Sequence, residues 1–237
     1  MSGIGLVLSC EHASWTLPPD VDLGVPGEIL RSQASWDHGA HDIIAAVADA
    51  LGIHLHAGLF SRMFVDLNRA PTHADVIPRI SYGEVVPGNH ELDERTRAER
   101  LEMFHAPYWA AVRRECEARL LDRGRVFHFS SHTFSPGLDP ASRTYEIGVL
   151  YDPSHAFEAE IAERMMFALR GAGLDVRANQ PYGGTGPAIC TELRTLFGAP
   201  YAGIQLETSH AVTETPGGCG RVAAAVLPFL ESLVSDS

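Results

Sequence analysis

Three short apolar runs in this chain end in side chains that can bind a metal ion or transfer a proton. The run LVLSCEH ends at His12, the run FHFSSH ends at His132, and the run IQLE ends at Glu207. A fourth group, Asp37, lies at the start of a helical pattern that follows the first run. Ligands of open α/β sheets bind beyond the carboxyl ends of the strands. We therefore expect these four side chains to meet at one rim of a sheet.

Two imidazoles and one carboxylate form a donor set that suits zinc. Three protein ligands also leave a fourth position for water, as hydrolytic zinc sites require. We interpret His12, Asp37 and His132 as the ligands of one divalent ion per chain. Glu207 would then stand beside the attacking water as the general base of a metal-assisted hydrolysis.

Other interpretations of these residues stay open on the sequence. The chain has twelve histidines, and a histidine near a strand end is often structural, hydrogen-bonded to the backbone. Glu11 would replace Asp37 as a ligand if a loop at the strand end freed it. Cys10 shares a strand face with His12, which raises the alternative of a thiol nucleophile. That mechanism lacks an evident oxyanion donor or orienting partner, so Cys10 is expected to pack as a small apolar residue.

The elements that must position these residues alternate between short strands and longer helices. Apolar positions in 35–52 recur at helical spacing, with Ser35 as the expected N-cap and Gly52 as the stop. A long helical stretch covers 91–124, with a break or kink near Pro107. The other expected elements are strands at 3–10, 125–134, 146–152, 174–184 and 201–210, a strand or a pair of strands at 53–60 and 62–67, and helices at 153–173 and 217–235.

This alternation predicts an α/β fold, a three-layer sandwich. A mostly parallel central sheet would be covered by helices on both faces. One domain is expected over residues 1–237, because no internal repeat or linker-like stretch divides the chain. Residues 70–93 contain three prolines and little periodicity. We interpret them as an inserted loop or lid over one end of the sheet.

The stretch SRMFVDLNR holds candidates for substrate binding. Its two arginines and one amide, Arg62, Arg69 and Asn68, can hold a carboxylate through paired hydrogen bonds. A charge cluster after an apolar run is also typical of a solvated loop. Asp66 would orient either an arginine or its own turn, and Arg143, ahead of a later strand, is a further candidate.

Two further motifs carry weaker signals. His105 and Tyr108 lie three residues apart, hence on one helix face if the helix continues past Pro107. Substrate contact and simple packing are equal alternatives for this pair. The glycine-rich NQPYGGTG lacks the lysine and the spacing of a phosphate-binding loop. Its glycines are expected to allow a tight turn and a close approach of the backbone to a ligand.

Composition and charge narrow the classes of function. The 237 residues are 45% hydrophobic, enough for a sizeable core. Thirty acidic against 18 basic residues give a net charge of −12, which disfavours nucleic-acid binding but still permits a local positive pocket for an anionic substrate. We expect no membrane span and no signal peptide. Four cysteines without a CxxC pair favour a cytoplasmic protein with reduced thiols.

Six motifs, LVLSCEHAS, SRMFVDLNR, HAPYW, FHFSSHTF, NQPYGGT and IQLETSH, resemble those of the N-formylglutamate amidohydrolase family in order and spacing. That family is similar in fold to the zinc carboxypeptidases and the zinc cell-wall amidases. The resemblance therefore implies a zinc exopeptidase-like sheet with the metal at its strand ends. Carried over by position, it implies the ligands His12, Asp37 and His132 and the catalytic Glu207. It is also the main support for a substrate role of SRMFVDLNR.

The resemblance implies a zinc-dependent amidohydrolase acting on a small anionic N-acyl amino acid. The substrate would be most like N-formyl-L-glutamate, and the products a free amino acid and a short acid. Two alternatives remain: a zinc peptidase or cell-wall amidase on the same scaffold, and a binding protein that kept the pocket without catalysis. No nucleic-acid or membrane partner is expected.

Overall fold

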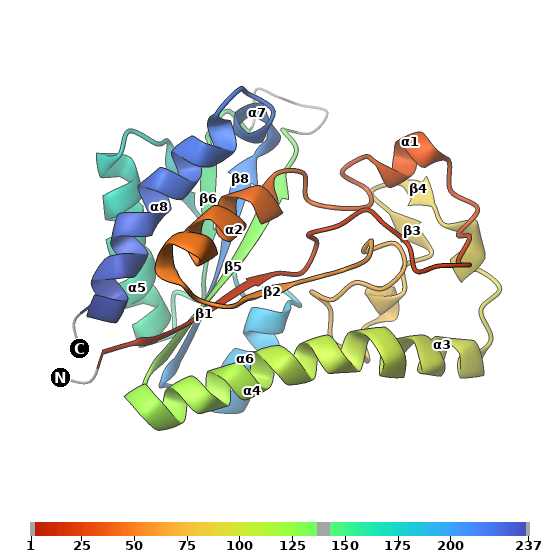
Figure 1. Ribbon diagram of the computed structural model, residues 1–237, viewed down its shortest axis with the longest axis horizontal. Coiled ribbons are helices and arrows are strands. Elements are labelled where there is room, and N and C mark those ends of the chain that lie inside the picture. Colours follow the sequence, from red (N-terminus) through yellow and green to blue (C-terminus); the bar gives the residue numbers. More distant parts are fainter. Residues whose placement is uncertain (1–2, 137–142, 236–237) are drawn as a thin grey trace.

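The computed structural model describes residues 3–136 and 143–235 (Figure 1). The strands of its main sheet are β1 (Gly5–Cys10), β2 (Leu55–Ala57), β5 (Val126–Phe134), β6 (Ile147–Leu150), β7 (Val176–Ala178) and β8 (Tyr201–Ser209). They lie in the order β2-β1-β5-β8-β6-β7. All neighbours are parallel except β6 and β8, which are antiparallel. The prediction of a mostly parallel sheet is confirmed.

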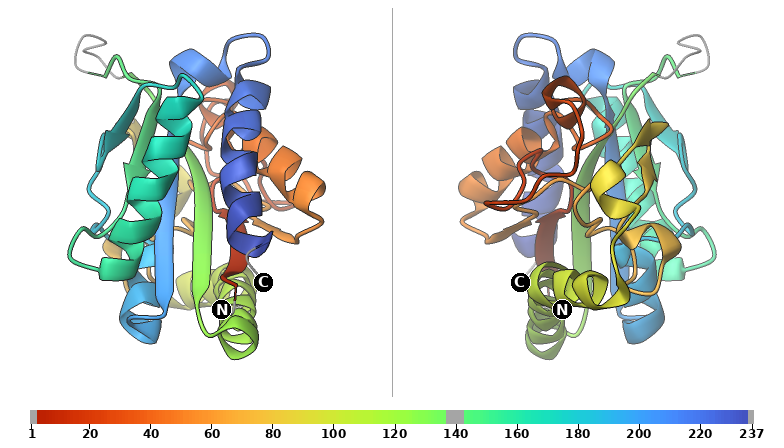
Figure 2. Two further views of the ribbon diagram at one scale, coloured as in Figure 1. Left: turned by 90° about the vertical axis from the view of Figure 1, so that its left-hand side faces the viewer. Right: turned by 90° about the vertical axis from the view of Figure 1, so that its right-hand side faces the viewer.

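Helices cover both faces of this sheet (Figures 1 and 2). The α-helices are α1 (Gly27–Leu30), α2 (Ala40–Leu51), α3 (Glu94–Arg100), α4 (Ala106–Arg123), α5 (Ala156–Gly171), α6 (Ile189–Phe197), α7 (His210–Thr213) and α8 (Gly218–Ser235). One core joins α2, α5 and α8 to Leu6 and Leu8 of β1, whereas α4 and α6 pack with Val7. Successive side chains of a strand point to opposite faces, so β1 contributes to both layers. The predicted three-layer sandwich is confirmed.

A second, smaller core lies beyond the sheet, beneath residues 70–93. The elements of this segment are η1 (Ala74–Val76), β3 (Ile80–Ser81), β4 (Glu84–Val85) and η2 (Pro87–Asn89). The right-hand view of Figure 2 faces this segment. Val76 and Val86 pack here against Met63 and Phe64. The 70–93 segment is therefore folded and anchored at one end of the sheet.

The helix predicted from Ser35 begins at Ala40 instead. Ser35 does not cap it, because its hydroxyl lies 2.6 Å from the hydroxyl of Ser61. The N–H of Asp37 donates to the carbonyl oxygen of His12 at 3.0 Å. This bond holds the turn before α2 against the end of β1. Asp37 consequently reaches the rim from a turn rather than from a helix.

Residues 62–67 do not form the predicted strand. The N–H groups of Phe64 and Val65 both donate to the Ser61 carbonyl oxygen, at 2.9 and 3.3 Å, so the chain turns here. The apolar side chains of the run are all buried in the second core. Because these apolar side chains are all buried, the sequence shows no alternation of apolar and polar residues that would distinguish a turn from a strand. The turn delivers Asp66 to the rim of the sheet.

The predicted helical stretch 91–124 is one continuous run. It consists of α3, a π-helical turn at Leu101–His105, and α4, and it ends at Gly124 as predicted. Pro107 lies in the first turn of α4, where a missing N–H is tolerated, and the wide π turn precedes it. Within 3–136 and 143–235, no helix is both long enough and apolar enough to cross a membrane.

A buried ion pair ties α6 to α5 and to the sheet. Nε of Arg194 donates to Oε1 of Glu158 at 2.7 Å. The same carboxylate accepts from the N–H groups of Gly203 at 2.8 Å and Asp152 at 2.9 Å. A second nitrogen of Arg194 donates to the carbonyl oxygen of Gly184 at 3.1 Å. The sequence did not predict α6, since this buried arginine interrupts its short apolar face.

We expect Arg194→Met to lower the free energy of unfolding by about 3–5 kcal/mol, because it leaves the buried Glu158 carboxylate without its cation. Urea denaturation of the purified chain measures the change. The control is Arg113→Met, which breaks an exposed pair with Glu117 and should change the same quantity by less than about 1 kcal/mol. Equal effects of the two substitutions would contradict this role of Arg194.

Candidate metal centre

A cavity of about 650 Å³ opens at the carboxyl ends of β1, β5 and β8. Most of the predicted site residues line it: His12, Asp37, Arg62, Asn68, Arg69, His132 and Glu207. Its other walls come from the 70–93 segment and from residues 182–188. His105, Tyr108 and Arg143 are not among the lining residues.

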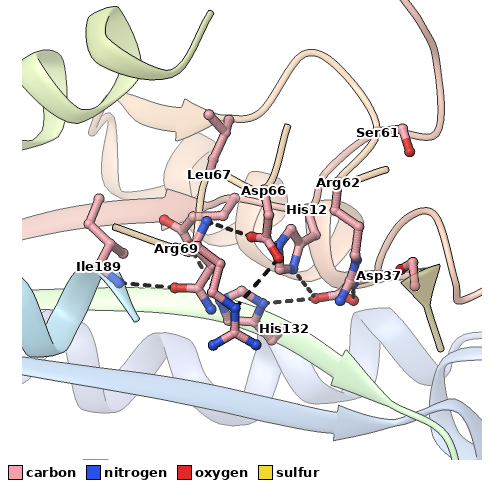
Figure 3. Close-up of polar contacts among 12 residues, drawn as sticks. His12, Asp37, Ser61, Arg62, Asp66, Leu67, Arg69, His132 and Ile189 are labelled. Carbon is pink, nitrogen blue, oxygen red and sulfur yellow. Dashed lines mark hydrogen bonds and ion pairs between the residues drawn. The ribbon is translucent and has the colours of Figure 1, made fainter. Parts of the chain in front are cut away.

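His12, Asp37 and His132 converge at the floor of this cavity (Figure 3). Oδ2 of Asp37 lies 3.3 Å from Nδ1 of His12 and 2.8 Å from Nδ1 of His132. One candidate ligand atom from each residue lies within 4.8 Å of the others. All three side chains are buried. Two imidazole nitrogens and a carboxylate oxygen at this separation fit a zinc ion with an open fourth position.

Each imidazole contacts a second carboxylate through its Nε2 atom. Nε2 of His12 lies 2.7 Å from Oδ1 of Asp66, and Nε2 of His132 lies 3.0 Å from Oε2 of Glu11. A bond at Nε2 leaves Nδ1 of each ring as the nitrogen that faces the metal position. The sequence does not point to this role for Asp66 or Glu11. The only sequence signal is that both are acidic residues beside other site residues.

The charges around these rings shift several pKa values. Burial and then the charge of Arg62 lower the pKa of His12 to about 4, so its ring is neutral at pH 7, as a metal ligand must be. Burial would lower the pKa of His132 too, but the hydrogen bond and charge of Glu11 raise it. Burial opposes ionisation of Asp66, yet its contact with His12 holds the Asp66 pKa below its usual range.

Glu11 does not take the place of Asp37 in this arrangement. The Tyr108 hydroxyl donates to Oε1 of Glu11 at 2.9 Å, and the Ser130 hydroxyl donates to Oε2 at 2.5 Å. Together with His132, these groups engage both carboxylate oxygens behind the imidazole. Glu11 is fully buried and does not line the cavity. The carboxylate that faces both imidazoles is Asp37.

Glu207 lies beside His132 on the neighbouring strand. The two residues are paired in the parallel ladder of β5 and β8. Burial raises the pKa of Glu207, and its Oε2 is buried with no hydrogen-bond partner among the described residues. Buried polar atoms are normally partnered. Glu207 lines the cavity, and a carboxylate with a raised pKa at this place is chemically suited to accept a proton.

The predicted carboxylate-binding residues lie along one wall. Arg62 forms an ion pair with Oδ1 of Asp37, the oxygen turned away from the imidazoles. Oδ1 of Asn68 accepts from the N–H of Ile189 at 3.2 Å. This contact uses the carbonyl oxygen of the amide and not its NH₂ group. Arg69 donates to the carbonyl oxygen of Pro187 and remains 36% exposed in its side chain. Figure 3 shows the side chains of Arg62 and Arg69 extending from this turn toward Asp37 and His132, and all three residues line the cavity.

His105 and Tyr108 support the site from beneath. Nε2 of His105 lies 2.7 Å from the carbonyl oxygen of Arg69, and Tyr108 binds Glu11 as described. Cys10 is fully buried in the main core, away from the cavity, which agrees with the packing role expected of it. Arg143 lies outside the lining, with its guanidinium 5.8 Å from the ring centre of Tyr182 at the cavity edge.

The glycines of NQPYGGTG allow a close approach, but to the protein's own backbone. A Cβ atom on Gly184 would lie 2.1 Å from the backbone nitrogen of Tyr151, a distance that no side chain tolerates. The loop is thereby pressed against the end of β6, where it forms part of the cavity wall. Gly183 and Gly186 line the cavity, so the expected approach of this loop to a ligand stays a prediction.

Comparisons with known proteins identify the family and the fold. The profile of the family described as N-formylglutamate amidohydrolase matches residues 4–212. The crystal structure of a gene product from Agrobacterium tumefaciens superposes with a TM-score of 0.80 at 30% identity, covering 99% of this chain and 90% of that one. An N-formylglutamate amidohydrolase from Ralstonia eutropha JMP134 superposes with a TM-score of 0.73 at 18% identity, covering 100% and 96%. The comparison with curated proteins gave no match.

Proposed function

The chain belongs to the N-formylglutamate amidohydrolase family, and we propose that it is a zinc-dependent hydrolase of a small N-acyl amino acid most like N-formyl-L-glutamate. The observation that carries the proposal is the convergence of His12, Asp37 and His132, with Glu207 opposite His132. Amide hydrolysis by this arrangement gives a free amino acid and a short acid.

The metal position would lie between the two imidazole rings and the Asp37 carboxylate, and binding would require the neutral form of His132, whose pKa Glu11 raises. Nδ1 of His12, Nδ1 of His132 and Oδ2 of Asp37 would hold the ion. Zinc bound there would polarise the acyl carbonyl and lower the pKa of the attacking water toward about 7. Asp66 and Glu11 keep the two rings turned toward the ion.

Glu207 would act as the general base and then as the acid. Its carboxylate takes a proton from the attacking water while the water oxygen forms a bond to the acyl carbon. The same proton is delivered to the leaving nitrogen as the amide bond breaks, so the products are a carboxylic acid and an amine. Burial supports this role, because it raises the pKa of Glu207 from its ordinary value toward neutrality.

Substrate carboxylates would bind to the SRMFVDLNR wall. Arg69 and Asn68 both line the cavity, and the Arg69 side chain is partly exposed although it lies 3.8 Å from a carboxylate oxygen of Asp66. Paired donors of this kind match the geometry of a carboxylate. Arg62, further in, would place its positive charge near the scissile group. Arg143, which does not line the cavity, would reach at most an outer carboxylate beside Tyr182.

Metal removal and a substrate panel test the function. We expect chelated protein to lose hydrolysis of N-formyl-L-glutamate, because the ion polarises the scissile carbonyl, and to regain it when zinc is added back. The amount of formate released measures activity. Protein that was exchanged into the same buffer without chelator is the control. Full turnover after complete metal removal would contradict zinc dependence.

The panel also separates the alternatives. Hydrolysis of muropeptides or acyl-dipeptides without hydrolysis of N-formyl amino acids would favour a cell-wall amidase or peptidase. Thermal stabilisation by N-formyl-L-glutamate without any product would favour a binding protein.

A further inference from the structure

Two tyrosines meet at the solvent end of the cavity. Tyr82 belongs to the 70–93 segment and Tyr182 to the NQPYGGTG loop, and both line the cavity. Their hydroxyl oxygens lie 3.4 Å apart. Tyr82 is 51% exposed and Tyr182 39% exposed, whereas the candidate metal ligands are buried. The pair therefore bridges two opposite walls where the cavity meets solvent.

Each ring is held by an arginine. The guanidinium carbon of Arg62 lies 5.3 Å from the ring centre of Tyr82, and that of Arg143 lies 5.8 Å from the ring centre of Tyr182. Both distances are within the range of cation–π attraction. Arg62 also pairs with Asp37. The Tyr82–Tyr182 contact is thus held on one side by Arg62, inside the cavity, and on the other side by Arg143, outside it.

The backbone at Tyr82 is costly for a tyrosine. Tyr82 and Gly83 are the two central residues of the β3–β4 hairpin turn, and their φ angles are +51° and +86°. Such turns favour Asn or Gly, because other residues are strained at positive φ. A bulky ring at this position stabilises neither the turn nor a core. Its contacts lie across the cavity mouth, with Arg62 and Tyr182.

We propose that Tyr82 and Tyr182 determine substrate length by closing the cavity to chains that extend beyond one acylated amino acid. The inference rests on the proposed function and names its substrate class: free N-acyl amino acids, with N-acyl peptides excluded. A peptide that placed its acyl carbonyl beside His12 and Glu207 would have to leave through the mouth. The two rings and their hydroxyl contact occupy that path.

The test compares two substrates that differ only in length. One is N-formyl-L-glutamate, and the other is the same compound extended at its α-carboxyl group by one alanine. We expect Tyr82→Gly to improve the ratio of kcat/KM for the extended over the short substrate about 10-fold or more. This variant is expected to fold, since glycine suits the positive φ of the turn.

Three further variants isolate the rings. Tyr82→Phe keeps the ring and should retain the preference for the short substrate. Val85→Ala alters an exposed side chain of the same hairpin that does not line the cavity, and it should behave as wild type. Tyr182→Ala should act like Tyr82→Gly. An unchanged substrate ratio in both Tyr82→Gly and Tyr182→Ala overturns the proposal.

Calorimetric binding separates this inference from the proposed function. If the wild type hydrolyses neither substrate, the proposed function fails. Binding still tests whether the two tyrosines exclude the extended compound from the cavity. The length proposal then holds if the wild type binds only the short compound and Tyr82→Gly binds both. Binding of both by the wild type overturns it, and binding of neither overturns both proposals.

Discussion

Replacing Glu207 with Gln should lower the turnover number about 10²–10⁴-fold, the usual contribution of a general base, while zinc stays bound. The amide keeps the size and shape of the side chain but cannot accept the proton of the attacking water. Initial rates on N-formyl-L-glutamate give the first quantity. Zinc content after dialysis gives the second.

Gln205→Ala is a comparison on the same strand, because Gln205 also lines the cavity and its Nε2 lies 2.9 Å from Nε2 of His132, but its amide is not a base. We expect it to retain far more activity than Glu207→Gln. Loss of the metal from Glu207→Gln would show that Glu207 is a ligand rather than the base.

Asp37→Ala and His132→Ala should each lose both bound zinc and activity, because each removes one of the three proposed protein ligands. Glu11→Gln should act differently. It keeps a group beside Nε2 of His132 but removes the charge, so zinc affinity should fall about 10–100-fold without being abolished. Competition with a coloured zinc chelator measures all three affinities.

Circular dichroism of each variant controls for unfolding, since these residues are buried. The assignment of Asp37 depends on the comparison with Glu11. A chain that keeps its zinc in Asp37→Ala and loses it completely in Glu11→Gln would reverse the two roles.

The strand ends could be predicted because parallel strands share a rim. The apolar runs before His12, His132 and Glu207 are buried at every position of β1, β5 and β8, and such runs are typical of central parallel strands. Their carboxyl ends therefore had to coincide. The antiparallel direction of β6 could not be predicted, since a buried four-residue strand carries no sign of its direction.

The second carboxylates escaped prediction for a different reason. Asp66 is 54 residues from His12 along the chain, and it reaches the ring because residues 62–67 turn. The apolar pattern of that stretch suits a strand equally well, so no spacing rule points from one residue to the other. Glu11 meets His132 only because β1 and β5 are neighbours, and that pairing is a property of the whole sheet.

The residues proposed for catalysis and the residues proposed for substrate length lie on different kinds of structure. Backbone hydrogen bonds of the ladder between β5 and β8 set the spacing between His132 and Glu207, and mutation of side chains elsewhere leaves it intact. The residues at the mouth belong instead to a hairpin and a loop, which tolerate insertion and exchange. Mutations at the mouth can therefore change which substrate lengths the proposed enzyme would accept, while the spacing between His132 and Glu207 stays the same.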